Sequence, residues 1–275
     1  MTYILFGLLG LLAGSTLNLA IDRLTPTEAP RPLAFRCPAC GARRPALGSV
    51  PVLGYIIFRG RCPACGARAS LRALWVELAT GFIWALLWGI PGLLPLRRVL
   101  LTAYASILLV ILVIDLERRL VPNVIVLPAI GLAALAVPLE LLVKPVPFGH
   151  YGLLYVLLRM AGGPALPPPL LGVISLILGG VIAFVIFLVI WLIAPQGMGA
   201  GDVKLAAFVG LITGFPVAIA AICGAFLVSG LVALGLLLSR WAGRKSTIPF
   251  APFLAVATVL ALIWGDRLLL WYLGM

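Results

Sequence analysis

The sequence predicts an all-α integral membrane protein with about eight transmembrane helices and a small polar domain between the first two. The chain of 275 residues is 63% hydrophobic and 10% charged, with a mean hydropathy of +1.22. Soluble domains are roughly half apolar and a quarter charged. The apolar residues gather in long runs, and one polar stretch near the N-terminus holds four of the five cysteines. Lipid is therefore the expected solvent for most of the chain.

Each predicted transmembrane helix is an apolar run with few charges. A helix needs about 20 such residues to cross the hydrocarbon layer of about 30 Å. The runs cover residues 2–21, 74–94, 99–114, 121–143, 170–194, 203–213, 216–239 and 250–273. The sixth is short and meets the seventh at residues 213–216, so seven spans and a broken helix fit nearly as well. The first run lacks the features of a cleaved signal peptide and is expected to remain as a helix.

The net charge of +12 is distributed unevenly between the two sides predicted for the membrane. With the N-terminus outside, fifteen of the twenty Lys and Arg residues face inward, as the positive-inside rule expects. These are Arg23, Arg31, Arg36, Arg43, Arg44, Arg59, Arg61, Arg68, Arg72, Arg118, Arg119, Lys204, Arg240, Arg244 and Lys245. The pair Arg97 and Arg98 violates the rule. Anionic lipids are sufficient partners for this basic surface, and no nucleic acid partner is expected.

Two polar breaks divide the chain. The predicted organisation is a first transmembrane helix at residues 1–21, an inserted cytoplasmic domain at 22–73 and a membrane domain of about seven helices at 74–275. A second break at residues 144–169 contains proline clusters around an apolar patch at 151–160. That patch is interpreted as an interfacial helix, with a collapsed loop as the alternative.

The inserted domain contains two nearly identical cysteine turns. They are Cys37-Pro-Ala-Cys40-Gly and Cys62-Pro-Ala-Cys65-Gly, separated by 21 residues. Two such turns can place four thiolates around one tetrahedral Zn²⁺, with no position left open for water or substrate. Because a segment of about fifty residues with this little apolar content cannot build a sufficient core, a structural zinc ion would supply the folding free energy.

Two disulfides, or a redox pair, are the alternatives for these cysteines. The duplicated spacing favours zinc, and the predicted inner side of the membrane is a reducing compartment that disfavours disulfides. The fifth cysteine, Cys223, lies in an apolar run and is expected to be an inert core residue.

The chain has eight acidic residues, and three of them stand out. Glu77, one turn into the second apolar run, could pair with an arginine of the inserted domain or serve a site. Asp115 closes the third run and Asp202 opens the sixth, and both lie at the predicted inner face. The remaining acids are interpreted as solvated charges: Asp22, Glu28, Glu117, Glu140 and Asp266.

A carboxylate at the margin of the hydrocarbon is costly and is a candidate functional group. Two carboxylates held together cannot both ionise easily, so one keeps a proton while the other acts as a base. Such a pair can activate water against a peptide carbonyl and protonate the leaving amine. Glycines on the approach to Asp202, namely Gly197, Gly199 and Gly201, would let a substrate backbone lie close. In the alternative, an arginine pairs with Asp115, and Asp202 caps a helix beside Lys204.

Taken together, these segments resemble the prepilin peptidases, the type IV leader peptidases of pilus and type II secretion systems. The resemblance covers most of the chain. It includes the end of the first helix at residues 14–24, the cysteine turns, residues 75–81, the segment from Asp115 to Asn123, Gly199-Ala-Gly-Asp202, and residues 248–254. Two positions depart from the family pattern, since Asn123 replaces a common aspartate and Ala251 the usual glycine.

The resemblance implies a bacterial inner-membrane aspartic endopeptidase with Asp115 and Asp202 as the catalytic pair, supported by Gly199, Gly201 and Lys204. It implies cleavage of the basic leader of prepilins or pseudopilins after a glycine at the cytoplasmic face. It further implies N-methylation of the new terminus by S-adenosylmethionine, although no methyltransferase glycine motif is visible. A transporter that binds ions at the two aspartates, and a non-catalytic scaffold, are the competing hypotheses.

Overall fold

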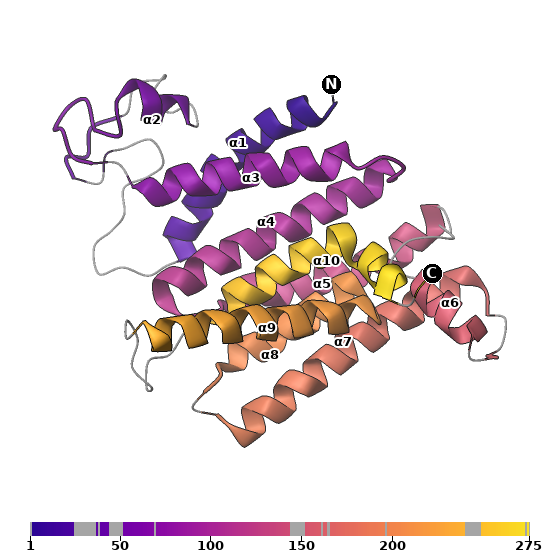
Figure 1. The fold of residues 1–275 in the computed structure, drawn as a ribbon. Helices are drawn as coiled ribbons and strands as arrows, with labels where there is room; N and C mark the ends of the chain where they lie inside the picture. The colour runs from indigo at the N-terminus through magenta and orange to yellow at the C-terminus, as the bar shows by residue number, and fades with distance from the viewer. Residues whose placement is uncertain are drawn as a thin grey trace. The chain divides into compact units, whose positions relative to one another are not determined.

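The computed structural model describes residues 2–24, 37, 39–43, 52–68, 70–143, 152–160, 162–163, 166–195, 197–239, 249–272 and 274. Within these ranges the chain forms α-helices connected by turns, with no β-strand, and the predicted all-α class is confirmed (Figure 1). Predictions that fall on residues 25–36, 44–51, 144–151 and 240–248 lie outside the described residues.

Six helices of the described chain are long and apolar enough to cross a membrane. Large apolar side chains on their outer faces stay exposed, including Ile193 at 79% and Trp271 at 78%. Such faces are stable only in lipid, so the chain is a multi-pass membrane protein. The six helices are α1 (Thr2–Leu24), α3 (Leu71–Gly89), α4 (Pro95–Arg118), α7 (Pro168–Ile193), α9 (Val217–Leu238) and α10 (Ala251–Tyr272).

The other two predicted spans correspond to α5 (Asn123–Val143) and α8 (Ala200–Thr213). At 14 residues, α8 is about 21 Å long, shorter than the hydrocarbon layer of about 30 Å. The helix break predicted at residues 213–216 is confirmed, because α8 ends at Thr213 and Gly214 has a φ of 70°. The apolar patch of the second polar break forms α6 (Gly152–Met160), and its location at the membrane surface stays a prediction.

The chain forms two compact units, Met1–Val110 and Ile111–Met275. In the first unit, glycines let α1 and α3 approach closely. A Cβ atom added to Gly10 would lie 2.8 Å from the Gly81 Cα, and one added to Gly14 would lie 2.6 Å from the Glu77 Cα. Glycines at helical spacing are typical of tight helix pairs in membranes, where packing replaces the hydrophobic effect.

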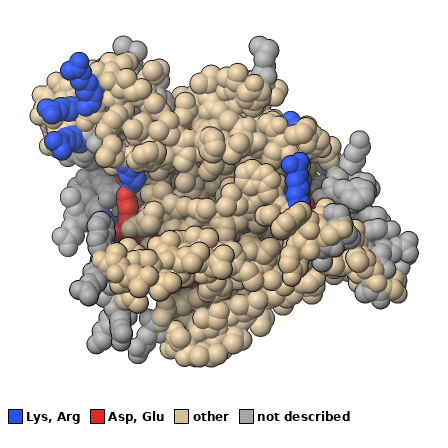
Figure 2. Space-filling model, in the orientation of Figure 1, with Lys and Arg blue, Asp and Glu red and all other residues tan. Residues whose placement is uncertain are grey.

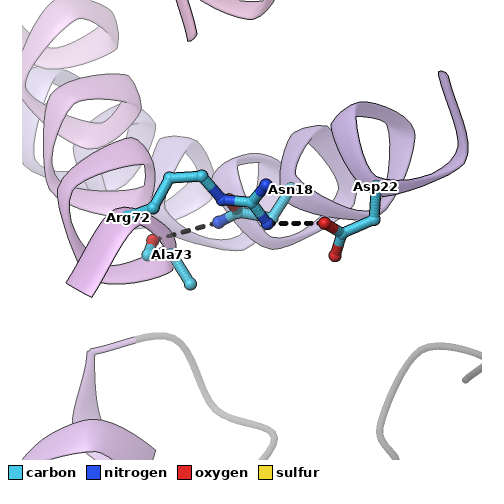
Figure 3. A network of polar contacts seen from close by, with 4 residues as sticks. All are labelled: Asn18, Asp22, Arg72 and Ala73. Atoms are coloured by element: carbon cyan, nitrogen blue, oxygen red, sulfur yellow. Dashed lines mark hydrogen bonds and ion pairs between the residues drawn. The ribbon is translucent and has the colours of Figure 1, made fainter. Parts of the chain in front are cut away.

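Polar contacts extend along the same helix pair where the inserted segment leaves α1 and returns to α3 (Figure 3). The Asn18 side chain donates a hydrogen bond to the Ala73 carbonyl at 3.0 Å. One turn further, Arg72 and Asp22 form an ion pair at 2.7 Å. The ion pair joins the two ends of the inserted segment.

In the second unit, α8 is the buried helix. Leu205, Ala206, Phe208 and Val209 have no exposed surface, and α7 approaches α8 closely at a glycine pair. A Cβ atom on Gly179 would lie 2.6 Å from the α8 carbonyl of Gly210. Helices α5, α9 and α10 also contact α8. Asp202, in the first turn of α8, is thus held by a helix with little freedom to move.

Candidate active site and metal centre

The four cysteines of the inserted segment form one cluster in the first unit. The sulfur atoms of Cys37, Cys40, Cys62 and Cys65 all lie within 4.8 Å of one another, and those of Cys37 and Cys65 are 3.7 Å apart. Four thiolates at about 2.3 Å from a central Zn²⁺ would be about 3.8 Å apart. The cysteines are free thiols, and 3.7 Å is far longer than a disulfide bond of about 2.05 Å. The cluster has the composition and size of a metal site.

The two turns of the cluster have the same backbone geometry. In the first, the Cys37 N–H donates to Ala42 and the Gly41 N–H donates to Cys37, both at 2.9 Å. In the second, the matching bonds of Cys62 and Gly66 are both 2.8 Å. Gly41 and Gly66 have φ values of 70° and 72°, which side chains rarely tolerate. The glycine after each second cysteine is therefore required by the turn.

Backbone amides and neighbouring sulfurs set the ionisation of the thiols. The N–H groups of Cys40 and Ala39 lower the pKa of the Cys37 thiol to about 6. At Cys65 the Ala67 amide lowers the pKa, but the neighbouring thiols and burial outweigh it and raise the pKa to about 12. One thiol is thus ionised easily, and a second stays protonated because its proton is shared with the neighbouring sulfurs. A divalent cation would displace that proton.

Asp115 lies in the last turn of α4, which ends at Arg118. Asp115 is only 5% exposed, and its Oδ2 atom has no hydrogen-bond partner among the residues that the structure describes. The backbone amide of Ala251, at the start of α10, donates to the carboxylate, and the Arg119 guanidinium acts on it electrostatically. An unpaired buried carboxylate oxygen costs free energy, which makes this position a candidate for chemistry.

Asp202 lies in the first turn of α8, where its carboxylate accepts a hydrogen bond from the Gly199 amide. Burial raises the pKa of Asp202 to about 6, and the negative charge of Asp115 contributes to the increase. Two side chains 87 positions apart in the sequence therefore interact electrostatically. The hydrogen bond to Gly199 also caps the start of α8. Helix capping, the alternative interpretation of Asp202, therefore applies alongside its interaction with Asp115.

The turn that follows Asp115 rests directly on the first turn of α8. A Cβ atom on Gly201 would lie 2.8 Å from the Val121 Cβ and 3.2 Å from the Val121 carbonyl oxygen. Lys204 Nζ donates to Asn123 Oδ1 at 2.8 Å, at the start of α5. Lys204 thus pairs with the segment after Asp115, and Asn123, a departure from the family pattern, is part of that contact.

The three glycines before Asp202 differ in their surroundings. Only Gly201 is closed by a neighbour, because a Cβ on Gly199 would come no nearer than 3.7 Å to the Asp202 Oδ2. At Gly197 the nearest atom would be 3.5 Å away. Sequence reasoning treated the three alike, and it missed Val121 and the Ala251 amide, whose importance depends on contacts between distant segments.

Glu77 contacts both α1 and the inserted segment. Ser15 Oγ donates to Oε1 at 2.7 Å, and the Val52 amide donates to Oε2 at 2.9 Å. Val52 has a φ of 59°, a strained conformation for a β-branched residue. Glu77 therefore connects the helix pair to the backbone at the start of the short helix α2 (Leu53–Ile57).

The cysteine segment carries an exposed group of arginines: Arg43, Arg59, Arg61 and Arg68. Basic side chains gather near α2 in the space-filling view, and most of the visible described surface is uncharged (Figure 2). The fifth cysteine, Cys223, is exposed on α9, so the expectation of a core position is wrong.

Two family models match the chain. Residues 8–90 match the bacterial peptidase A24 N-terminal domain, which includes the cysteine cluster. Residues 102–265, more than half of the chain, match the type IV leader peptidase family and include both aspartates.

Relatives from several bacteria carry the name prepilin leader peptidase/N-methyltransferase. The Pseudomonas aeruginosa protein is 30% identical over 294 residues, which cover 97% of this chain and 91% of the relative. The Aeromonas hydrophila protein is 32% identical, covering 86% and 73%. The Bacillus subtilis protein is 27% identical, covering 87% and 85%. No solved structure matches this chain.

Proposed function

The chain belongs to the type IV leader peptidase family, and from that membership we propose that it is an aspartic endopeptidase of the bacterial inner membrane that uses Asp115 and Asp202. Its proposed substrates are type IV prepilins or type II secretion pseudopilins. The observation that carries the proposal is the interaction of the two carboxylates at the end of α4 and the start of α8.

The proposed reaction divides the work between the two carboxylates. One, as the carboxylate, takes a proton from water, and the water oxygen attacks the peptide carbonyl that follows a glycine. The other, as the carboxylic acid, gives its proton to the amine as the C–N bond breaks. The pKa of Asp202, raised to about 6, keeps a larger fraction of this group protonated near neutral pH than an ordinary aspartate would have. The pair titrates as a unit, so the roles belong to the pair.

The supporting residues have different proposed roles. Gly199 contributes its amide to Asp202, and it has no side chain to obstruct the close approach of an extended substrate; a Cβ there would make ordinary contacts, the nearest 3.7 Å from the Asp202 Oδ2. Gly201 and Lys204 contact the turn that follows Asp115. We include the division into residues 1–21, 22–73 and 74–275 in the proposal, with the inserted domain and both aspartates at the cytoplasmic face.

We also propose a structural zinc ion at Cys37, Cys40, Cys62 and Cys65. The four sulfurs fit a tetrahedral site, and thiolate ligands suit Zn²⁺. The names of the relatives support a second activity, N-methylation of the new terminus, for which S-adenosylmethionine would supply the methyl group. No residue of this chain is assigned to that activity.

The decisive experiment incubates the reconstituted protein with a full-length prepilin and S-adenosylmethionine. Asp115→Asn and Asp202→Asn are each expected to lower the cleavage rate by at least about 10³-fold, since each removes a member of an acid–base pair. Mass spectrometry of the pilin terminus separates cleavage from methylation. Normal cleavage by either variant would refute the pair. Ion flux in the same proteoliposomes, with no cleavage by the parent, would favour the transporter.

A further inference from the structure

The two glycines of the Gly199-Ala-Gly201-Asp202 segment have different surroundings. The difference bears on how Asp115 and Asp202 are positioned. Gly201 is in the first turn of α8, where alanine would be the better helix former. Helix propensity alone therefore favours a larger residue. The close contact with Val121 gives a specific reason for glycine at this position.

Val121 lies in the turn between α4, which carries Asp115, and α5. It follows Asp115 by six residues and precedes α5, which starts at Asn123. A Cβ on Gly201 would be 2.8 Å from the Val121 Cβ, whereas carbon atoms in ordinary contact are about 3.5–4.0 Å apart. An alanine at residue 201 would thus require a displacement of about 1 Å at this contact.

A displacement at this contact would also move the aspartates, because Gly201 and Val121 are each close in the sequence to one of them. Gly201 is adjacent to Asp202, and α8 is buried against its neighbours and cannot retreat easily. The Val121 turn is connected to Asp115 by only five residues, so a shift of this turn would be passed on to Asp115. The Lys204 to Asn123 hydrogen bond fastens the same two segments on the next turn of α8.

We propose that the Gly201–Val121 contact, fastened by the Lys204–Asn123 hydrogen bond, sets the distance between Asp115 and Asp202, which makes Val121 a positioning residue. This inference rests on the proposed function of the two aspartates. Because an error of about 1 Å in a reacting geometry can cost about 100-fold in rate, Gly201→Ala is expected to lower kcat by about that factor and to leave KM within about twofold.

The test is a size exchange across the contact. Val121→Gly removes the Cβ atom that alanine at residue 201 would meet. The pair Gly201→Ala with Val121→Gly is expected to have a higher kcat than either single variant. Gly131→Ala is the matched control, because Gly131 is in a helix and has open space around its Cα. It is expected to leave kcat unchanged. Lys204→Arg, which keeps a donor for Asn123, is expected to retain more activity than Lys204→Met.

Three results would overturn the inference: full activity of Gly201→Ala, a pair no faster than the slower single variant, or equal losses in Gly201→Ala and Gly131→Ala. If Gly201→Ala cannot be recovered folded, the comparison of the pair with Val121→Gly alone decides, and a pair slower than Val121→Gly refutes the contact. Asp115→Asn and Asp202→Asn are assayed in parallel. If they cleave normally, the proposed function fails; if they are inactive and the exchange does not restore activity, only this inference fails.

Discussion

Because its pKa is raised in the folded state, Asp202 lowers the free energy of unfolding at neutral pH. The carboxyl ionises near pH 3.9 in an unfolded chain and near pH 6 in the folded one. The unfolded state therefore loses its proton first as pH rises. The stability of the protein decreases between about pH 4 and pH 6 on account of this group, and the penalty is constant above that range.

Asp202→Asn, which removes the charge and keeps the shape, is expected to stabilise the protein at pH 7. The gain should be about 1–3 kcal/mol at pH 7 and close to zero near pH 4. Thermal unfolding in detergent at both pH values measures it. In an Asp115→Asn background the gain should be smaller, because the repulsion between the carboxylates is gone. An equal gain in both backgrounds would contradict their proximity.

At the scale of single residues, the sequence identified which residues are unusual in their surroundings better than it identified which residues are in contact. Asp115 and Asp202 stood out because charge beside an apolar run is rare, and that signal is local. The contact of Gly201 with Val121 and the hydrogen bond from the Ala251 amide to Asp115 each join segments 80 or more residues distant in the chain. No pattern within one segment could predict them.

At the scale of helices, α1 and α3 pack against each other through a row of small residues. Whether this contact tolerates a larger residue can be tested. A Cβ on Gly14 would lie 2.6 Å from the Glu77 Cα, which is backbone and cannot move aside. Gly14→Ala is expected to destabilise the protein by about 1–3 kcal/mol, as overpacking does. Gly235→Ala in α9 is the matched control, since its Cα has open space. Equal melting temperatures for the two variants would show that α1 and α3 can separate at little cost.

The cysteine segment is an element whose order is expected to depend on metal. The purified protein should contain about one zinc ion per chain, and Cys62→Ser should lose it. Because the metal supplies folding free energy to a segment without a core, trypsin should then cut faster at Arg59 and Arg61. Zinc analysis and timed proteolysis test this. Full zinc content in Cys62→Ser would mean that the four cysteines are not the ligand set.

Helix ends were predictable where glycine or proline marked them, as at residues 213–216. Length was less predictable, because apolarity alone cannot separate a spanning helix from a short buried one. The run at residues 203–213 has the composition of a span, yet α8 is buried among other helices of its unit. A helix surrounded by protein is as apolar as a helix surrounded by lipid.

At the scale of the whole molecule, the distribution of arginines predicts the orientation in the membrane. The cysteine segment is expected inside the cell, so trypsin should cut Arg59, Arg61 and Arg68 in inverted vesicles and spare them in right-side-out vesicles. These arginines are exposed at the surface of the segment, so trypsin on the same side of the membrane can reach them. Cleavage in right-side-out vesicles alone would reverse the proposed orientation and place the zinc cluster outside.

The two cysteine turns also give the cysteine cluster an internal repeat. Each has the sequence Cys-Pro-Ala-Cys-Gly-Ala-Arg and the same pair of backbone hydrogen bonds. Because both turns need glycine at the same place, Gly41→Ala and Gly66→Ala should each weaken metal retention, although the residues are 25 positions apart. The repeat also gives Arg43 and Arg68 equivalent places in the two halves, so the centre presents a matched pair of positive charges to whatever surface it faces.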